Sequence, residues 1–299
     1  MFNHLLVPLD GSTLAESALP AVVMIAKTMK ASVTLFHVIE QNAPAAIHQD
    51  HHLTESAQAD EYLKSVAGLR FPPGISVNWH VHSAAVRDVA ESIATHAHEF
   101  DTDLIIMCTH GRGGMRDMLF GTIAQQVLAR AAAPVLLLRP EERAEKGQFN
   151  IHRILVPLDS ESIHDEIFPY ATGLAGAFGS ELGLLTVIPT YGTLSGEQAA
   201  LGSLLPGTTS ALLEIEEEET RNHLEDHLAE LQKQGLIASA AIARGDPVSE
   251  IVAAGARWKA DLILLATHRK AGIDAFWARS VAPNIARNTR SPILLLPLK

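Results

Sequence analysis

An internal repeat constrains this chain more than any other feature of its sequence. Three blocks recur in the same order: residues 4–11 as 153–160, 103–110 as 261–268, and 133–140 as 291–298. Matched blocks in a fixed order indicate a duplication. The chain has 299 residues, which suits two domains of about 150 residues each. We therefore predict one domain over 1–140, a charged linker over 141–150, and a second domain over 151–299.

Each half alternates strand and helix patterns. In the first half we expect strands at 5–9, 32–39, 75–82, 104–108 and 135–138, and helices at about 13–30, 54–69, 86–99 and 121–132. Continuous apolar strands between helices are typical of parallel sheets covered on both faces. The prediction is an α/β chain of two repeated doubly wound domains, each a five-stranded parallel sheet with helices on both faces.

Two consequences follow from that architecture. Ligands of doubly wound sheets bind beyond the carboxyl ends of the strands, near the switch point, where the turn at Asp10 and the loop after Cys108 should meet. The last strand of each half, at 135–138 and 293–296, is apolar and lies at a sheet edge, which invites pairing. We expect the two halves to pack as a pseudo-twofold pair, and a homodimer of chains is plausible on the same ground.

Composition excludes several classes of function. The formal net charge is −11, which disfavours sequence-independent nucleic-acid binding and anionic membrane surfaces. No apolar stretch reaches transmembrane length, and the first residues do not resemble a secretory signal. Cys108 is the single cysteine, so no disulfide forms within the chain. We expect a cytoplasmic protein with no nucleic-acid and no membrane partner.

A glycine-containing loop is predicted to carry the chemistry. Between the strand ending at Cys108 and the next helix, glycines stand at 111, 113, 114 and 121, followed by Thr122. Glycine lets main-chain N–H groups approach a phosphate, and a helix N-terminus adds unpaired N–H groups and a favourable dipole. From the residues alone a phosphate cradle and an ordinary glycine-rich helix entry remain open, since glycine loops are weak signals. The loop lacks the Gly-Lys-Ser/Thr of a P-loop.

These residues resemble those of tandem universal stress proteins. ATP-binding members of that family carry Gly-x2-Gly-x9-Gly-Ser/Thr after the fourth strand, matched here by Cys108, Gly111, Gly121 and Thr122, with cysteine replacing the first glycine. The resemblance includes 7–10 (VPLD) and 37–39 (HVI). It implies that Asp10 and Val38 flank the adenine.

The same resemblance implies ATP as the ligand, with or without Mg²⁺. It implies that Met107 and Cys108 lie beside the ribose and that the glycine loop faces the phosphates. The complete set of implied nucleotide-binding residues is Pro8, Leu9, Asp10, Val38, Met107, Cys108, Thr109, His110, Gly111, Arg112, Gly114, Gly121, Thr122 and Ile123.

The second half has lost this loop motif. Its corresponding positions hold Ala266, Arg269 and Arg279 in place of the glycines, and only Ser280 is kept. Our hypothesis is that Arg279 pairs with a nearby carboxylate such as Asp274 and fills the site. The rival is that the arginines bind a different anion, because arginine suits phosphate and carboxylate.

Several other features have duller interpretations. Residues 48–52 (HQDHH) could hold a metal but are interpreted as a polar surface loop. Arg87 is interpreted as a solvated helix-start residue rather than a ligand of the phosphate or ribose, and Cys108 as a buried structural thiol. The acidic run 214–219 is expected at the start of a helix. The stretch 190–209 is interpreted as a long loop, either a lid, a partner-binding loop or an insertion.

Three functions remain open on the sequence. The favoured one is an ATP-binding stress-response or signalling protein in which the nucleotide, bound mainly in the first domain, is a structural ligand or a switch. The second is a slow ATP hydrolase or phosphotransferase, although no Walker lysine or placed base is evident, so no catalytic residue is assigned. The third is a nucleotide-free scaffold that acts through protein contacts.

Overall fold

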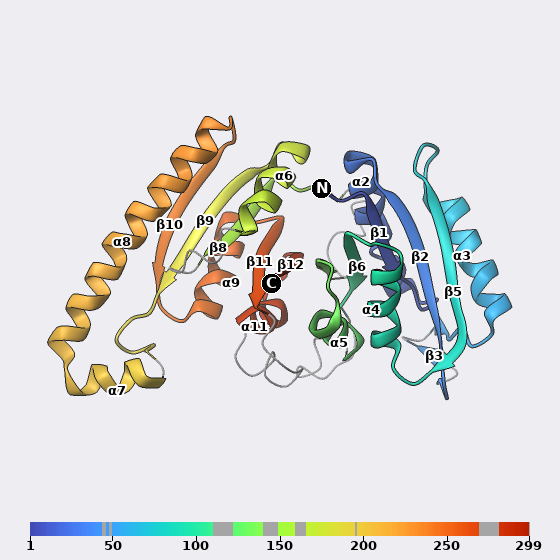
Figure 1. Cartoon of the computed structure of the whole chain (residues 1–299), viewed down its shortest axis with the longest axis horizontal. Coiled ribbons are helices and arrows are strands. Elements are labelled where there is room, and N and C mark those ends of the chain that lie inside the picture. The colour runs from blue at the N-terminus through green and yellow to red at the C-terminus, as the bar shows by residue number, and fades with distance from the viewer. Residues whose placement is uncertain are drawn as a thin grey trace.

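The computed structural model describes residues 1–43, 46–47, 50–109, 122–139, 149–158, 166–194, 196–268 and 281–298 (Figure 1). The first half comprises β1 (His4–Pro8), α1 (Thr13–Glu16), α2 (Leu19–Met29), β2 (Ser32–Glu40), β3 (Ala46–Ile47), β4 (Asp50–His51), α3 (Ser56–Arg70), β5 (Val77–Val86), α4 (Val89–Glu99), β6 (Leu104–Cys108), α5 (Thr122–Arg130) and β7 (Val135–Leu138). The second comprises β8 (Arg153–Leu158), α6 (Phe168–Phe178), β9 (Glu181–Ile188), α7 (Gly196–Leu204), α8 (Pro206–Lys233), β10 (Ala238–Arg244), α9 (Pro247–Trp258), β11 (Leu262–His268), α11 (Val281–Asn288) and β12 (Ile293–Leu298).

The two halves share one ten-stranded sheet, ordered β10-β9-β8-β11-β12-β7-β6-β1-β2-β5. Within each half the neighbouring strands are parallel, and they have the order third-second-first-fourth-fifth. The halves join where β12 pairs antiparallel with β7, with Leu294 opposite Leu136. This junction confirms that the predicted edge strands pair the two halves, and the doubly wound α/β class is confirmed.

Each face of the sheet carries one apolar core that runs through both halves. One core packs α2, α3, α6 and α8 against the sheet, and the other packs α4, α5, α9 and α11 (Figure 1). Contacts also cross between halves outside the sheet, because α2 touches α6 and the Phe2 and Tyr170 ring centroids lie 6.1 Å apart. The shared cores indicate that the halves are packed together rather than strung loosely on a linker.

Most predicted elements are present, with three corrections. The expected helix at 13–30 is two helices, α1 and α2, because the chain turns at 17–18. The stretch 190–209, interpreted as a loop, contains α7 and the beginning of α8. As α8 begins at Pro206, the acidic run 214–219 lies inside a 28-residue helix rather than at its start. The predicted linker falls mostly outside the described residues, and its boundaries stay predictions.

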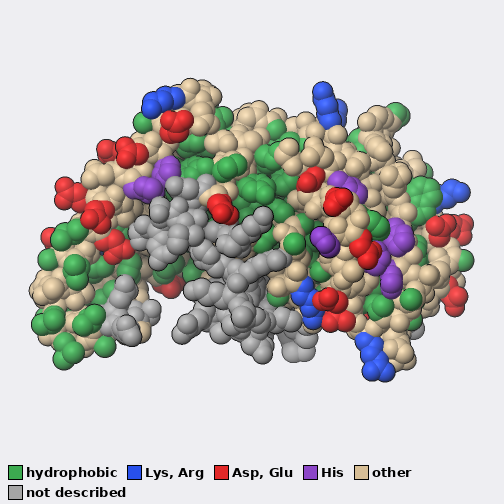
Figure 2. Space-filling view, in the orientation of Figure 1, with side chains coloured by type: hydrophobic (Ala, Val, Ile, Leu, Met, Phe, Trp, Pro, Cys, Tyr) green, Lys and Arg blue, Asp and Glu red, His purple; other side chains and the backbone are tan. Residues whose placement is uncertain are grey.

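The helices α7 and α8 form an apolar and acidic end of the second half. Hydrophobic side chains gather over them at the lower left of the molecule (Figure 2). The exposed hydrophobic residues there include Leu201, Leu204, Leu205, Leu212 and Ile215. Among the described residues, no helix combines the length and apolarity needed to cross a membrane.

Candidate functional site

A cavity of about 110 Å³ lies at the carboxyl ends of β1, β2 and β6 in the first half. Its lining residues are Pro8, Leu9, Asp10, Leu14, Ala15, Phe36, His37, Val38, Glu40, His52, Val89, Ile93, Met107, Cys108, Ile123 and Ala124. The strands end here because the apolar run of β1 stops before Asp10 and that of β2 before Glu40. Parallel strands place these endings at one edge of the sheet, where doubly wound folds bind ligands.

The cavity brings together half of the predicted binding set. Pro8, Leu9, Asp10, Val38, Met107, Cys108 and Ile123 all line it. Thr109 is buried but is absent from the lining; its main-chain N–H and its Oγ1 both donate to the Leu138 carbonyl of β7, at 2.8 and 3.3 Å. Thr122 begins α5. The remaining predicted residues, His110, Gly111, Arg112, Gly114 and Gly121, lie outside the described residues, as does the Asp274–Arg279 pair of the second half.

Asp10 organises the turn after β1. Its Oδ1 accepts hydrogen bonds from the main-chain N–H and the hydroxyl of Ser12, at 3.0 and 2.6 Å. The Ser12 hydroxyl in turn accepts from the Ala15 N–H at 3.1 Å and caps α1. Serine and aspartate favour such turns and caps because their oxygens replace missing main-chain partners. Asp10 therefore fixes the turn with Oδ1.

A second carboxylate, that of Asp50, accepts hydrogen bonds from the first residue of α1. Asp50 Oδ2 of β4 accepts from the N–H and the hydroxyl of Thr13, at 2.8 and 3.0 Å. The short β3–β4 ribbon thus reaches across to the helix whose Leu14 and Ala15 line the cavity.

Residues 48–52 were interpreted as a surface loop, and that interpretation is wrong for His52, which is 3% exposed and lines the cavity. Among the described residues, no cluster suited to a metal ion is found.

His37 joins three segments around the cavity. Its side chain is 2% exposed, and its Nδ1 lies 2.7 Å from the Leu9 carbonyl oxygen while its Nε2 lies 3.1 Å from that of Leu53. A neutral imidazole can donate to one of these acceptors, and only the imidazolium can donate to both. The residue holds the end of β1, the end of β2 and the chain before α3 in one arrangement.

Cys108 is the small residue at the end of β6. Its Sγ lies 3.1 Å from the Ser17 hydroxyl of the turn between α1 and α2. Burial raises the pKa of the Cys108 thiol to about 12, partly opposed by the Ser17 hydrogen bond. Since the thiolate is the reactive form, Cys108 is an inert side chain at neutral pH. The interpretation of Cys108 as a structural thiol agrees with this burial.

Two helices form the apolar wall of the cavity. Val89 and Ile93 come from α4, and Ile123 and Ala124 come from the first turn of α5. At the edge of this region Arg87 is exposed, and its Nε donates to the Gln41 side chain at 2.9 Å. That contact fits the interpretation of Arg87 as a helix-start residue.

The sequence did not reveal several cavity residues. Those missed are Leu14, Ala15, Phe36, His37, Glu40, His52, Val89, Ile93 and Ala124. Glu40 could have been found, because it is a charged residue at the end of an apolar strand that points to the ligand edge. The apolar residues of α1, α4 and α5 carry no such signal, since helical spacing places core residues in the same pattern.

In chemical terms the site is an apolar slot with acceptors at its rim. The walls are aliphatic and aromatic, and Asp10 and Glu40 supply carboxylate oxygens. Such a site suits a flat ligand with N–H or O–H donors on its edge. Nothing in the described lining presents a lysine or arginine, so an anionic part of a ligand has to be held by other groups.

Comparison with known proteins places this chain. The sequence model of the universal stress protein family matches residues 1–139 and 150–297. The chain is 24% identical over 148 residues to the universal stress protein YxiE of Bacillus subtilis, which covers 46% of this chain and 100% of the relative. It is 26% identical over 151 residues to the universal stress protein MJ0531 of Methanocaldococcus jannaschii, which covers 48% of this chain and 85% of the relative.

Solved structures agree on the fold. A universal stress protein from Archaeoglobus fulgidus superposes with a TM-score of 0.69 at 16% identity, covering 99% of this chain and 96% of that one. The functionally unknown protein PA1789 from Pseudomonas aeruginosa also gives 0.69 at 16% identity, covering 99% of this chain and 93% of that chain. Because the family model matches both halves in succession, the chain belongs to the universal stress protein family, with two family domains in tandem.

Proposed function

We propose that this protein binds ATP in the cavity of its first half and acts as a nucleotide-binding stress-response protein. The observation that carries the proposal is the meeting of residues from separate segments. Asp10 follows β1, Val38 lies near the end of β2 and Cys108 ends β6, and with Ile123 at the start of α5 they line one cavity. These are positions that the family resemblance assigns to the nucleotide.

The chemistry of the lining suits an adenine nucleoside. Adenine offers a flat aromatic face and an N–H donor edge, and ribose offers O–H donors, which match the apolar walls and the carboxylates of Asp10 and Glu40. The ring of Phe36 and the side chain of Val38 provide apolar contact on the α4 side. The base and sugar are therefore proposed to lie between β1, β2 and β6.

The phosphates are proposed to lie at the N-terminal end of α5. The glycine motif ends at Gly121, immediately before α5. Unpaired N–H groups and the helix dipole favour anions at such an end. The corresponding residues of the second half carry arginines at two glycine positions, and we propose that this half does not bind ATP.

Mass spectrometry of the purified protein and titration calorimetry with Mg-ATP test the proposal. We expect an adenine nucleotide in the purified protein, or ATP binding by the nucleotide-free protein. Gly121→Val should abolish the binding, because a β-branched side chain blocks close approach of the main chain to a phosphate. Gly176→Val is the matched control, since the space around Gly176 in α6 is open within 4 Å.

The outcomes separate the three functions. Binding that is lost in Gly121→Val and kept in Gly176→Val supports the proposal. Turnover well above that of a Gly111/Gly121 double variant would make the protein an ATP hydrolase. A melting temperature that millimolar ATP leaves unchanged would contradict nucleotide binding and favour the scaffold, because a ligand of the native state must stabilise it.

A further inference from the structure

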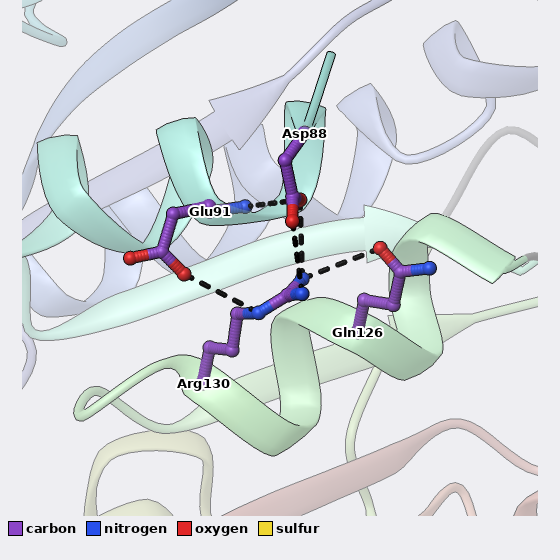
Figure 3. Close-up of polar contacts among 4 residues, drawn as sticks. All are labelled: Asp88, Glu91, Gln126 and Arg130. Atoms are coloured by element: carbon purple, nitrogen blue, oxygen red, sulfur yellow. Dashed lines mark hydrogen bonds and ion pairs between the residues drawn. The ribbon is translucent and has the colours of Figure 1, made fainter. Parts of the chain in front are cut away.

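An arginine at the end of α5 ties this helix to the start of α4. Arg130 donates from Nη1 and Nη2 to the two carboxylate oxygens of Asp88, at 3.2 and 2.9 Å (Figure 3). Its Nε lies 3.3 Å from Glu91 Oε2, and its Nη1 also donates to Gln126 Oε1 at 3.2 Å. We call Asp88, Glu91, Gln126 and Arg130 the Arg130 cluster.

The Arg130 cluster is ordered by the helices that it joins. Asp88 is the N-cap of α4 and accepts a hydrogen bond from the Glu91 N–H at 3.0 Å. This bond orients the Asp88 carboxylate independently of Arg130. The guanidinium forms two parallel hydrogen bonds with it, which fixes direction as well as distance. The Arg130 side chain is only 22% exposed, although Asp88 is 47% exposed.

The two helices joined by the Arg130 cluster both line the cavity. Val89 and Ile93 of α4 face the same space as Ile123 and Ala124 of α5. A nine-residue helix behaves as a rod about 13 Å long. Gln126 braces the arginine from within α5, and Arg130 holds the last turn of α5 against the start of α4, which sets the direction in which the first turn of α5 points.

The second half has the same two helices without this connection. Register and caps place Asp246 at the position of Asp88, but Ser249, Asn284 and Asn288 stand at the positions of Glu91, Gln126 and Arg130. Asp246 accepts from the N–H and hydroxyl of Ser249 in its own helix, at 2.9 and 2.8 Å. Asn288 donates to the Asn284 carbonyl of α11 at 2.8 Å. Helices α9 and α11 stay packed on the core without the arginine.

We propose that Arg130 is a positioning residue for the nucleotide site, which holds the N-terminal end of α5 where it receives the polyphosphate. The inference rests on the proposed function. The core of α5 does not need Arg130 to pack, as the second half demonstrates with Asn288. The arginine occurs in the half whose loop retains the phosphate motif, and its counterpart is absent where that motif is lost.

The position of the Arg130 cluster predicts which part of the ligand depends on it. The base and ribose are proposed to contact the ends of β1, β2 and β6, which the sheet holds in place. The phosphates are proposed to contact α5. Arg130→Gln should therefore weaken binding of ATP by about tenfold, within the usual range of coupling energies. Adenosine, which has no phosphate, should bind with nearly unchanged affinity.

Competition with a fluorescent nucleotide on the full chain tests this difference. The variants are Arg130→Gln, Arg130→Lys and Arg244→Gln, each titrated with ATP and with adenosine. Arg130→Lys keeps one charged contact but loses the paired geometry, so it should restore part of the ATP affinity. Arg244→Gln is the matched control, because Arg244 also pairs with a carboxylate, the half-buried Glu217, but lies in the second half.

The inference is supported by an ATP-specific loss in Arg130→Gln, partial rescue by lysine and no effect of Arg244→Gln. It is overturned if Arg130→Gln binds ATP as the unaltered chain does, and the proposed function then survives alone. An equal loss of ATP and adenosine with a lowered melting temperature would also overturn it, because it would show a purely structural role. If the unaltered chain binds neither ligand, the proposed function and the inference fall together.

Discussion

The two halves of this chain keep the same framework and differ at the edge of the sheet where the strands have their carboxyl ends. Both have the strand order third-second-first-fourth-fifth and bury apolar side chains at matching positions. Matching buried pairs include Leu5 and Ile154, Ile93 and Ile251, and Ala124 and Ala282. These pairs are as similar as close packing requires, since a core tolerates little change in volume.

Some cavity residues of the first half have no such counterparts. His37, Glu40 and Cys108 correspond in register to Thr186, Pro189 and Ala266. None of these replacements disturbs the strand order, so the fold does not require the polar residues of the first half. The difference indicates that packing maintains both halves, and we propose that ligand binding accounts for the residues that only the first half carries at this edge.

The largest effect is expected at the junction that both halves share. Leu294 of β12 is buried opposite Leu136 of β7, and Leu294→Asp would bury an unpaired carboxylate. We expect a loss of more than about 4 kcal/mol in the free energy of unfolding, measured by urea denaturation. Leu201→Asp, at an exposed leucine, should change it by less than about 0.5 kcal/mol. A mild effect of Leu294→Asp would show that the halves are joined weakly.

Core positions should respond alike in the two halves. Leu63 of α3 and Leu224 of α8 are buried on the faces of these helices that pack against the core. Each leucine-to-alanine substitution should cost about 2–5 kcal/mol, from lost burial and the cavity left behind. Circular dichroism during urea unfolding measures both. Two transitions, each sensitive to one substitution, would contradict the continuous cores and show that the halves unfold separately.

The sequence predicts the framework well, for reasons visible in particular elements. β1, β2, β6 and β7 lie within a residue of their predicted bounds because continuous apolar runs bracketed by polar residues have few alternatives. The break between α1 and α2 was missed because apolar spacing continues across Ser17. The helix α7 was missed because glycine and serine are common in loops, whereas packing against α8 decides its structure.

The candidate site is predictable in part. Residues at strand ends can be found from local sequence, whereas residues placed by long-range packing cannot. Asp10 and Cys108 follow from strand endings and from the loop motif. His52 does not, because its burial depends on how the β3–β4 ribbon folds back over the cavity. The Arg130 cluster joins Asp88 and Arg130, which are 42 residues apart in sequence, and nothing local in the sequence marks such a contact.

A smaller effect is expected at His37, a polar cavity residue that the second half replaces. His37→Thr gives the first half the residue of the second and leaves the Leu9 and Leu53 carbonyl oxygens without their imidazole partner. We expect a loss of about 1–3 kcal/mol in stability, the usual penalty for a buried group left unpaired. Thermal unfolding measures it. His98→Thr, at an exposed histidine of α4, is the control, and equal effects of the two would remove the special role of His37.

The smallest effect is a pH dependence confined to the first half. His80, His82 and His96 form a ring cluster, with His80 5.3 Å and His82 4.9 Å from His96 between ring centroids. The second half has alanine at all three positions, at 241, 243 and 254. Burial, followed by His96 and His82, lowers the pKa of His80 below its ordinary value of 6.5.

The direction of the pH effect follows from that shift. Well above pH 6.5 His80 is neutral in both the folded and the unfolded chain, so its titration takes nothing from the free energy of unfolding. As the pH falls through 6.5 toward the lowered value, the unfolded chain takes up the proton more readily, so stability declines. The melting temperature should fall between pH 8 and pH 5, and His80→Gln should flatten this dependence. A steeper dependence in His80→Gln would mean that the sign is wrong.

The stoichiometry of ATP binding tests the difference between the halves most directly. Titration calorimetry of the nucleotide-free chain with Mg-ATP gives the number of sites and their affinity in one experiment. We predict one ATP per chain, lost when Gly121 is replaced by valine. Two sites per chain would contradict the account by showing that the second half has kept its ligand, and no binding at all would remove the proposed site from the first.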